Sequence, residues 1–370
     1  MPTMSLKHKL KLLSNFVLEG RFREIYNMLW VYPLWWNRKW AAFLLNKLLP
    51  RLGIDLFPPF LEIEPTTICN MRCKVCEHTY WGEPSININF KDFKKIFDDF
   101  GKPKWLGLTG IGSSYLNKDY HKMMAYAKSK GTIIEVFDHF AHFKDEKQIR
   151  ELIEIGPDFQ FVSIYGANKK TSDFICQESD FNKIIKNLKT FVKLKKQLKK
   201  RFPVLNFHFI ITKQSKDEIF DFIELISGLN TEIGEVLITP LLHGFKQAET
   251  YEVKIDELYK RKVVDYARKK GISINFNWSS KLDKSPIRNC REYIMPFIFV
   301  TGHVTPCCAQ NEANQREWQK KLSLGNALEK PFREIWYSPK YKKMRQLIRE
   351  NKCPKECVLC PAYERRSLTS

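Results

Sequence analysis

Apolar and polar residues follow two periodicities through the middle of the chain. Short β-rich runs alternate with longer stretches in which apolar residues recur at helical spacing. The expected strands are Phe60–Glu64, Trp105–Thr109, Thr132–Phe137, Phe159–Ile164, Val204–Ile211 and Glu235–Thr239. The expected helices are Phe90–Phe100, Asp119–Lys130, Asp145–Ile155, Phe181–Leu198, Asp217–Leu229 and Ile255–Lys270. Because strands that alternate with helices form parallel sheets with right-handed crossovers, the pattern predicts an α/β fold of six strand–helix units, too few to close a (β/α)8 barrel.

Residues 1–58 precede this pattern and are expected to form a separate helical extension. Apolar residues at helical spacing are followed by a segment in which rings and cations are interleaved, namely Trp30, Trp35, Trp36, Arg38, Lys39 and Trp40. This composition is typical of a segment that lies at a membrane interface, and it predicts peripheral contact with an anionic membrane. The alternative is that these helices cover the bottom of the barrel and bury the tryptophans there. No apolar run reaches the roughly 18 residues that a membrane-spanning helix needs.

The charge of the chain suggests an anionic partner. Its 370 residues contain 62 Lys and Arg but only 41 Asp and Glu, which gives a net charge of +21. A membrane surface, a nucleic acid or a phosphorylated substrate would each suit this excess, and so would a merely solvated lysine-rich surface. No nucleic-acid-binding module is recognisable in the sequence. Ten cysteines without a signal peptide predict reduced, metal-binding cysteines in a cytoplasmic protein, and the basic extension would place it peripherally at the inner face of the membrane.

Three cysteines follow the first expected strand within eight residues. Cys69, Cys73 and Cys76 can all face one metal centre from a single loop. Three ligands leave one coordination position open, which is a property of catalytic rather than structural metal sites. The loop also lies at the carboxyl end of a strand, where α/β barrels place their chemistry. Zinc, with His78 completing the ligands, is the alternative that the spacing leaves open.

The spacing C-x3-C-x2-C after a first strand resembles the radical S-adenosylmethionine (radical SAM) family. This resemblance implies a [4Fe–4S] cluster on Cys69, Cys73 and Cys76, with the fourth iron chelated by the amino and carboxylate groups of SAM. It also implies that residues 59–278 form a partial (β/α)6 TIM-type barrel. An electron donor such as flavodoxin or ferredoxin would reduce the cluster. The expected reaction is reductive cleavage of SAM to a 5′-deoxyadenosyl radical, which abstracts hydrogen from an unreactive C–H bond.

The same resemblance implies which residues contact SAM. In the family, a Gly-Gly-Glu type turn after the second strand binds the SAM amino group, and the matching turn here contains Gly110, Gly112 and Ser113. A carboxylate is expected at Ser113 and is missing. Ser163, near the end of the fourth strand, would bond the ribose or carboxylate of SAM. At the end of the third strand, Asp138 or His139 could face the cofactor, or either could be a loop or capping residue.

The C-terminal residues 279–370 are rich in cysteine and are expected to form a small separate domain. The order Cys290, Gly302, Cys307, then Cys357-Val-Leu-Cys360, resembles the SPASM/twitch extension of radical SAM enzymes. That resemblance implies one auxiliary [4Fe–4S] cluster held by Cys290, Cys307, Cys357 and Cys360. Cys308 and Cys353 are spare and could replace one of these ligands, and structural zinc is the alternative for this region.

The substrate is not identified by any motif. The basic, aromatic N-terminal extension favours a lipid-linked or phosphorylated substrate. Peptide modification is the main rival, since SPASM-type extensions are frequent in peptide maturases. An RNA-modifying enzyme would suit the charge of the chain. A non-catalytic iron–sulfur scaffold would explain the missing carboxylate at Ser113.

Overall fold

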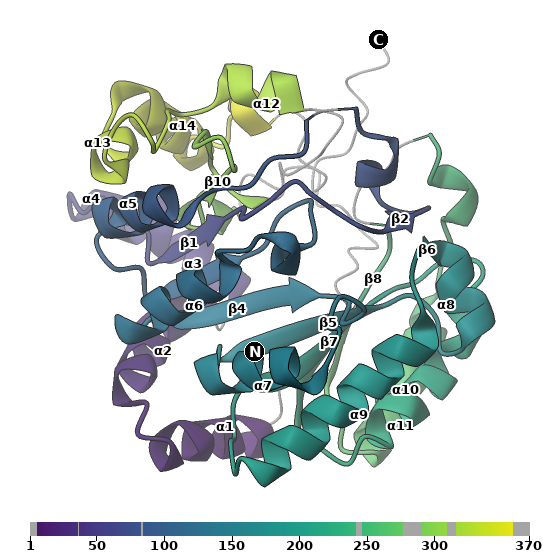
Figure 1. Cartoon of the computed structure of the whole chain (residues 1–370). Helices are drawn as coiled ribbons and strands as arrows, with labels where there is room; N and C mark the ends of the chain where they lie inside the picture. The colour runs from purple at the N-terminus through teal and green to yellow at the C-terminus, as the bar shows by residue number, and fades with distance from the viewer. Residues whose placement is uncertain are drawn as a thin grey trace.

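The computed structural model describes residues 6–35, 37–82, 84–241, 246–276, 290–308 and 316–357. Its main feature is a nine-stranded sheet in the order β11-β10-β1-β3-β4-β5-β7-β8-β9 (Figure 1). The strands are β1 (Phe60–Ile63), β3 (Trp105–Leu108), β4 (Ile133–Asp138), β5 (Phe159–Ile164), β7 (Val204–Ile210), β8 (Ile233–Thr239), β9 (Ile274–Phe276), β10 (Phe297–Ile298) and β11 (Val304–Thr305). All neighbours in this sheet are parallel except the hairpin of β10 and β11.

The sheet is open within the described residues, because its two edge strands, β11 and β9, are not paired with each other. All six expected strands are present with ends that differ by at most two residues from the prediction. The predicted α/β fold with a partial barrel is therefore confirmed. The three strands that the sequence did not predict are two or three residues long and extend the sheet at both edges.

The expected helices follow the strands and cover the outer face of the sheet (Figure 1). They are α5 (Phe90–Phe100), α6 (Tyr120–Ser129), α7 (Glu146–Ile155), α9 (Phe181–Gln197), α10 (Ile219–Ser227) and α11 (Glu257–Lys269). Local sequence sets their limits. In α7, for example, the Asp145 side chain accepts a hydrogen bond from Gln148 N, and the helix ends at Gly156 with φ of 63°.

The N-terminal helices pack against the barrel at the end where the strands begin. They are α1 (Leu6–Leu18), α2 (Phe22–Trp35), α3 (Arg38–Phe43), the π-helix η1 (Leu44–Leu48) and α4 (Leu49–Arg51). The Phe16 ring is fully buried 4.6 Å from the Phe202 ring, and the Trp35 ring lies 5.1 Å from that of Phe60. In Figure 1 these helices, in purple, lie at the side from which the β4 arrow starts. The extension therefore covers the bottom of the barrel, as the alternative interpretation expected, but Trp30 and Trp40 are not buried there.

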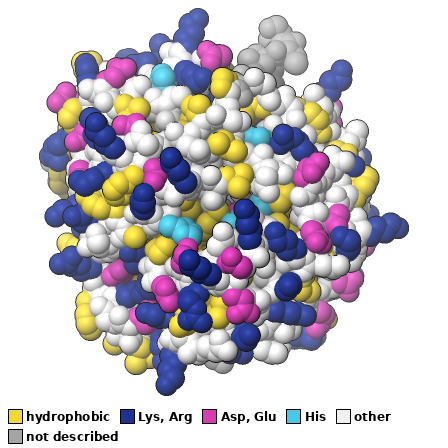
Figure 2. Space-filling model, in the orientation of Figure 1, with side chains coloured by type: hydrophobic (Ala, Val, Ile, Leu, Met, Phe, Trp, Pro, Cys, Tyr) yellow, Lys and Arg dark blue, Asp and Glu magenta, His cyan; other side chains and the backbone are white. Residues whose placement is uncertain are grey.

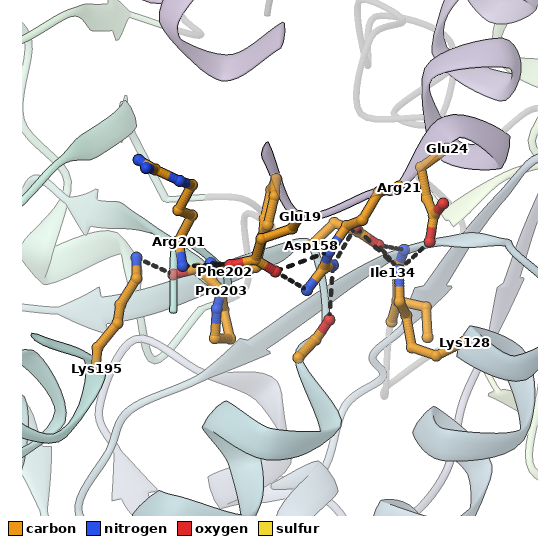
Figure 3. Close-up of polar contacts among 11 residues, drawn as sticks. Glu19, Arg21, Glu24, Lys128, Ile134, Asp158, Lys195, Arg201, Phe202 and Pro203 are labelled. Atoms are coloured by element: carbon orange, nitrogen blue, oxygen red, sulfur yellow. Dashed lines mark hydrogen bonds and ion pairs between the residues drawn. The ribbon is translucent and has the colours of Figure 1, made fainter. Parts of the chain in front are cut away.

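Buried charges join this N-terminal extension to the sheet (Figure 3). Asp158, just before β5, is fully buried; its Oδ1 lies 2.8 Å from Arg21 Nη1 and its Oδ2 lies 2.9 Å from Lys128 Nζ. The backbone N–H of Ile134 donates to the same carboxylate at 2.8 Å. Glu24 in α2 accepts a second bond from Lys128 at 2.7 Å. Every charge in this network has an opposite charge beside it, so the network fastens α1 and α2 to the barrel.

The C-terminal segment continues the barrel sheet and then adds helices. It contains η7 (Glu292–Ile294), β10, β11, α12 (Arg316–Leu322), α13 (Phe332–Trp336), α14 (Pro339–Arg349) and η10 (Lys355–Cys357). Because Phe297 in β10 is the register partner of Glu62 in β1, this segment and the barrel share one sheet. The proposed division near residue 278 lies outside the described residues, and the three-domain division stays a prediction. In the part of the chain that the structure describes, no helix is both long enough and apolar enough to cross a bilayer.

Candidate metal and cofactor site

A cavity of about 400 Å³ opens into the barrel at the carboxyl ends of the strands. Its wall contains all three cysteines of the C-x3-C-x2-C motif, Cys69, Cys73 and Cys76. It also contains every residue that was predicted to contact SAM, namely Gly110, Gly112, Ser113, Asp138 and Ser163, together with His139. These residues come from four separate segments of the chain, which meet in one cavity as expected for a catalytic site in an α/β barrel.

The cysteine loop is held by a short second sheet. Its strands are β2 (Arg72–Cys73) and β6 (Cys176–Gln177), which follows α8 (Lys169–Ile175). The antiparallel register places Cys73 opposite Cys176, with 2.8 Å between the two Sγ atoms. Cys176 lines the same cavity, and the sequence analysis missed it. It is 103 residues from Cys73 and belongs to no cysteine motif, so only the fold reveals this contact.

The donor chemistry of the loop fits an iron–sulfur cluster. Burial raises the pKa of Cys76 to about 12 and also raises the pKa of Cys69. Thiolates at such positions require a positive centre beside them, which a cluster iron supplies. The three thiols lie on one loop and face one cavity. Among the described residues, however, no three metal-binding side chains lie close enough together to hold one metal ion.

Gly110 and Gly112 are required by close packing within the protein. A Cβ atom on Gly110 would lie 2.3 Å from Glu64 Cγ, and one on Gly112 would lie 2.5 Å from the carbonyl oxygen of Ile68. The turn after β3 therefore presses against the cysteine loop, and Ser113 N donates to Ile68 O at 2.8 Å. This packing gives the two glycines a role that the sequence did not predict, and their contact with SAM stays a prediction.

A buried ion pair connects this turn with the C-terminal segment. Glu64, at the end of β1, lies 3.0 Å from Arg316 Nη1 in α12, and both side chains are almost fully buried. The Glu64 carboxylate also accepts the N–H groups of Ile111 and Val300, each at 3.1 Å. The Arg316 guanidinium stacks 4.1 Å from the centre of the Phe299 ring. One carboxylate thus joins β1, the glycine turn and the cysteine-rich region.

Asp138 brings a negative charge to the position where the glycine turn lacks one. Its carboxylate lies 3.4 Å from Ser113 Oγ, which donates to it. Phe140 N donates to Asp138 Oδ2 at 2.7 Å, and His142 Nδ1 lies 2.6 Å from the same oxygen. Burial alone would raise the pKa of Asp138, but the His142 and His139 imidazoles outweigh it and hold the pKa well below its usual range. Asp138 is therefore an ionised carboxylate in the cavity wall at neutral pH.

The two histidines have different positions around this carboxylate. His139 Nδ1 accepts the Ala141 N–H at 3.1 Å, so its hydrogen is on Nε2, which faces Ser113 Oγ at 3.4 Å. Burial is the main reason why the pKa of His139 is lowered, and the Asp138 carboxylate opposes this change. The His142 ring is stacked on Tyr115 with 4.2 Å between the ring centres. The sequence analysis missed His142, although its position four residues after a strand-end aspartate was a signal that could have been followed.

Three of the four predicted auxiliary ligands lie near two buried tyrosines. Burial is the main reason why the pKa of Tyr341 is raised, and the Cys307 and Cys357 thiols both add to the increase, so both lie near this ring. Cys290 acts in the same way on Tyr293. The Tyr341 hydroxyl is buried and has no hydrogen-bond partner among the residues that the structure describes, which fits a group that is still to be bound there. Cys360 lies outside those residues.

The two spare cysteines lie in different surroundings. Cys308 lines the main cavity beside Glu62, although the residue is exposed. It therefore faces the predicted SAM site rather than the gathering of Cys290, Cys307 and Cys357. Cys353 is exposed, and its thiol lies 3.4 Å from the carbonyl oxygen of Pro354. The position of Cys308 in the main cavity disfavours it as the substitute for an assigned auxiliary ligand.

Two family models match the chain. The radical SAM superfamily model matches residues 63–226, and the SPASM model, described as an iron–sulfur cluster-binding domain, matches residues 290–361. The first match contains the cysteine loop and the predicted SAM contacts. The second contains all the cysteines that were predicted to hold the auxiliary cluster. Together the models cover both cysteine groups.

Known proteins resemble the chain over most of its length. A relative from Pyrococcus furiosus, a tungsten-containing aldehyde ferredoxin oxidoreductase cofactor-modifying protein, is 25% identical over 324 residues, which are 81% of this chain and 86% of the relative. Streptococcus suis SuiB bound to its precursor peptide SuiA has a TM-score of 0.64 at 17% identity, covering 86% of this chain and 77% of SuiB. The enzyme anSMEcpe with bound AdoMet and Cp18Cys peptide has a TM-score of 0.57 at 15% identity, covering 81% and 85% of the two chains. Both structures share the fold of this chain.

Proposed function

Because the chain belongs to the radical SAM superfamily and carries a SPASM iron–sulfur domain, we propose that it cleaves SAM reductively and removes a hydrogen atom from a C–H bond of its substrate. The cluster and SAM, when bound, supply the 5′-deoxyadenosyl radical that performs this step. The observation that carries the proposal is the cavity that unites Cys69, Cys73 and Cys76 with the turn after β3 and the end of β4. The protein is an enzyme that uses SAM and iron–sulfur clusters, and the reaction itself is our proposal.

The chain's own residues have separate tasks in this scheme. Cys69, Cys73 and Cys76 hold the first cluster through three thiolates and leave one position for SAM. Ser163 lies on the cavity wall where it can bond the polar groups of SAM. The barrel encloses the reacting atoms and limits the access of water to them. Cys290, Cys307, Cys357 and Cys360 hold the auxiliary cluster, and an external flavodoxin or ferredoxin supplies the electron.

Asp138 replaces the carboxylate that the glycine turn lacks. The family pattern places a carboxylate after the second barrel strand, and Ser113 cannot supply a charge there. Asp138 comes from the next strand of the sheet, β4, and its carboxylate lies within 3.4 Å of the Ser113 hydroxyl. It is ionised and faces the cavity, so it can accept charge-assisted hydrogen bonds from the SAM ammonium group. This substitution removes the main reason for regarding the protein as a non-catalytic scaffold.

Two measurements test the proposed function. Anaerobic reconstitution should give roughly eight iron and eight sulfide per chain, since each [4Fe–4S] cluster contains four of each. Replacement of Cys69, Cys73 and Cys76 by Ala should remove about half of the iron. With dithionite, the wild-type protein should form 5′-deoxyadenosine from SAM, and Cys73→Ala should not. Stoichiometric zinc without iron uptake, or intact SAM after incubation with fully loaded protein, would overturn the proposal.

The relatives indicate two classes of substrate. The Pyrococcus relative is named for modification of an enzyme cofactor, whereas the SuiB and anSMEcpe structures contain peptides. We propose a substrate from one of these classes in place of RNA. On the face shown in Figure 2, Lys and Arg side chains are spread among Asp and Glu and do not form one basic patch. On that face, the net charge therefore does not mark a nucleic-acid site.

A second proposal concerns the N-terminal extension, which we infer to contact anionic membranes. Thirteen large apolar side chains between Leu10 and Ile54 are exposed, with Phe22 and Leu29 at 66%. Exposed Lys11, Arg23 and Lys39 lie on the same extension. Aromatic rings at the headgroup level and cations on anionic lipid would hold such a surface reversibly.

Point substitutions test this membrane contact better than truncation, because removal of residues 1–58 would also remove buried Phe16 and the Arg21–Asp158 pair. The protein should sediment with phosphatidylglycerol vesicles, and replacement of Phe22, Leu29 and Trp30 by Ser should reduce this severalfold. A matched control replaces exposed Phe174, which lies on α8. The membrane proposal would be contradicted if the wild type and all variants sedimented equally, or if none of them sedimented with the vesicles.

A further inference from the structure

The wall of the main cavity has the opposite charge to the rest of the protein. The chain carries +21 overall. Among the described residues that line the cavity, four are acidic (Glu62, Glu77, Glu135 and Asp138) and none is Lys or Arg. A phosphorylated substrate would find no cationic side chain in this part of the wall. The cavity therefore does not favour the phosphorylated substrate that the sequence suggested.

Two of these carboxyl groups face each other across a glycine. Glu62 in β1 is the register partner of Gly107 in β3, and Gly107 is the register partner of Glu135 in β4. Residues on one rung of a parallel sheet point to the same face, so both carboxyl side chains project into the barrel. A Cβ atom on Gly107 would lie 3.0 Å from Glu62 Cγ, so the absence of a side chain there leaves room for the Glu62 side chain to lie over this glycine, on the side of Glu135.

No Lys or Arg side chain among the described lining residues lies beside these two carboxyl groups. Burial raises the pKa of Glu62 to about 7, and burial followed by repulsion from Glu62 raises that of Glu135 to about 8. The Trp105 indole bonds Glu135, and the Cys308 thiol lies beside Glu62. Nevertheless, no donor in the described part of the chain lies at hydrogen-bonding distance and angle from Glu62 Oε2. His208 lines the same cavity, but burial lowers its pKa to about 4, so it brings no positive charge at neutral pH.

We propose that Glu62 and Glu135 bind a cationic nitrogen group of the substrate, such as an amine or an amidine-type group. This inference rests on the proposed function, because it assumes that the substrate enters the cavity beside SAM. A cation placed between the two carboxylates would compensate both buried charges and supply donors to the unpartnered oxygen. Cofactors and peptides both contain such nitrogen groups. The pair therefore selects by charge and does not require a particular substrate size.

Three isosteric probes test the charge preference directly. Benzamidine, benzamide and benzoate share one ring and differ in charge, so their dissociation constants can be compared by calorimetry on the reconstituted protein with SAM. Benzamidine should bind at least about tenfold more tightly than benzoate, with benzamide between them. In the Glu62→Gln/Glu135→Gln double variant this ratio should fall by about tenfold. Glu146→Gln, a control on α7 whose side chain is 61% exposed, should keep the wild-type ratio.

The outcomes of this experiment separate the inference from the proposed function. Benzoate binding as tightly as benzamidine, or a preference for benzamidine that survives in the double variant, would overturn the inference. If the double variant does not fold, Glu62→Gln and Glu135→Gln are measured singly, and each should reduce the ratio. Formation of 5′-deoxyadenosine without any probe is recorded separately. Its absence would overturn the proposed function while the charge preference could still be read.

Discussion

Asp158 at the bottom of the barrel and Glu62 in its cavity are both enclosed carboxyl groups, but their partners differ. Asp158 lies between Arg21 and Lys128 and also accepts a backbone N–H (Figure 3). Glu62 lies near the Glu135 carboxyl group and the Cys308 thiol, and its own Oε2 atom has no hydrogen-bond partner among the described residues. At the bottom, each charge is neutralised within the protein. In the cavity, no Lys or Arg of the described lining residues neutralises the two carboxyl groups, and burial favours their protonated forms.

This difference indicates which buried charges are structural and which are functional. A buried ion pair stabilises only when its geometry is complete, and the removal of one member leaves the other charge uncompensated. Titratable groups whose pKa is strongly shifted by burial, and which line a cleft, are candidates for function. Glu62 and Glu135 line the cavity and have pKa values raised by burial, so they are candidates for function. Asp158 forms buried ion pairs with Arg21 and Lys128, so these three residues are structural.

The largest expected effect is a loss of stability on substitution of Asp158 at the bottom of the barrel. Asp158→Asn should leave Arg21 and Lys128 without their shared anion, and it should lower the free energy of unfolding by about 3 kcal/mol or more. Urea denaturation followed by circular dichroism measures this change. The control is Asp265→Asn, which alters an ion pair whose two side chains are 60% and 74% exposed, and a much smaller loss is expected there. A loss below about 1 kcal/mol for Asp158→Asn would mean that the network does not fasten the N-terminal helices.

The second effect concerns SAM binding in the cavity. Asp138→Asn keeps the shape of the side chain but removes its charge, so the SAM dissociation constant should rise about tenfold to a hundredfold, as for the loss of a charge-assisted hydrogen bond. Equilibrium dialysis of the reconstituted protein measures it. Ser113→Ala should have a smaller effect, because a hydroxyl supplies no charge. A larger effect of Ser113→Ala than of Asp138→Asn would place the ammonium group at Ser113 and not at Asp138.

The third prediction uses the pH dependence of stability. The folded pKa values of Glu62 and Glu135, about 7 and about 8, exceed their ordinary value of 4.5. The folded state therefore holds more protons than the unfolded state between these values, and stability falls as the pH rises from about 4.5 to about 8. Glutamine cannot ionise. The double Gln variant should gain melting temperature relative to the wild type between pH 5 and pH 9, whereas a constant difference would show that the two carboxyl groups are not buried as described.

The smallest effect is expected at Cys176. Although its Sγ lies 2.8 Å from that of Cys73, the three loop cysteines suffice for the cluster, so Cys176→Ser should leave the iron content nearly unchanged. Cys73→Ser should lose about half of the iron in the same assay. An equal loss from both variants would identify Cys176 as a fourth ligand, which would close the position reserved for SAM.

The sequence was sufficient for features that are set locally. β5 spans Phe159–Ile164 as predicted, because an apolar run defines it. The three cysteines of the loop were found because their spacing is short. By contrast, β10 and β11 have two residues each and exist only because they pair with β1 and with each other. Cys176, Arg316 and the opposition of Glu62 and Glu135 also depend on contacts between distant segments, so no local pattern could reveal them.

The central claim is that SAM binds the cluster on Cys69, Cys73 and Cys76 in the main cavity. Low-temperature EPR of the dithionite-reduced protein tests it most directly, because a ligand that binds to a cluster changes its signal. Addition of SAM should shift the spectrum of the wild type and of Cys357→Ala, which affects only the auxiliary site. No shift should occur in Cys69→Ala. A wild-type spectrum that is unchanged at saturating SAM, or a shift that persists in Cys69→Ala, would contradict the account.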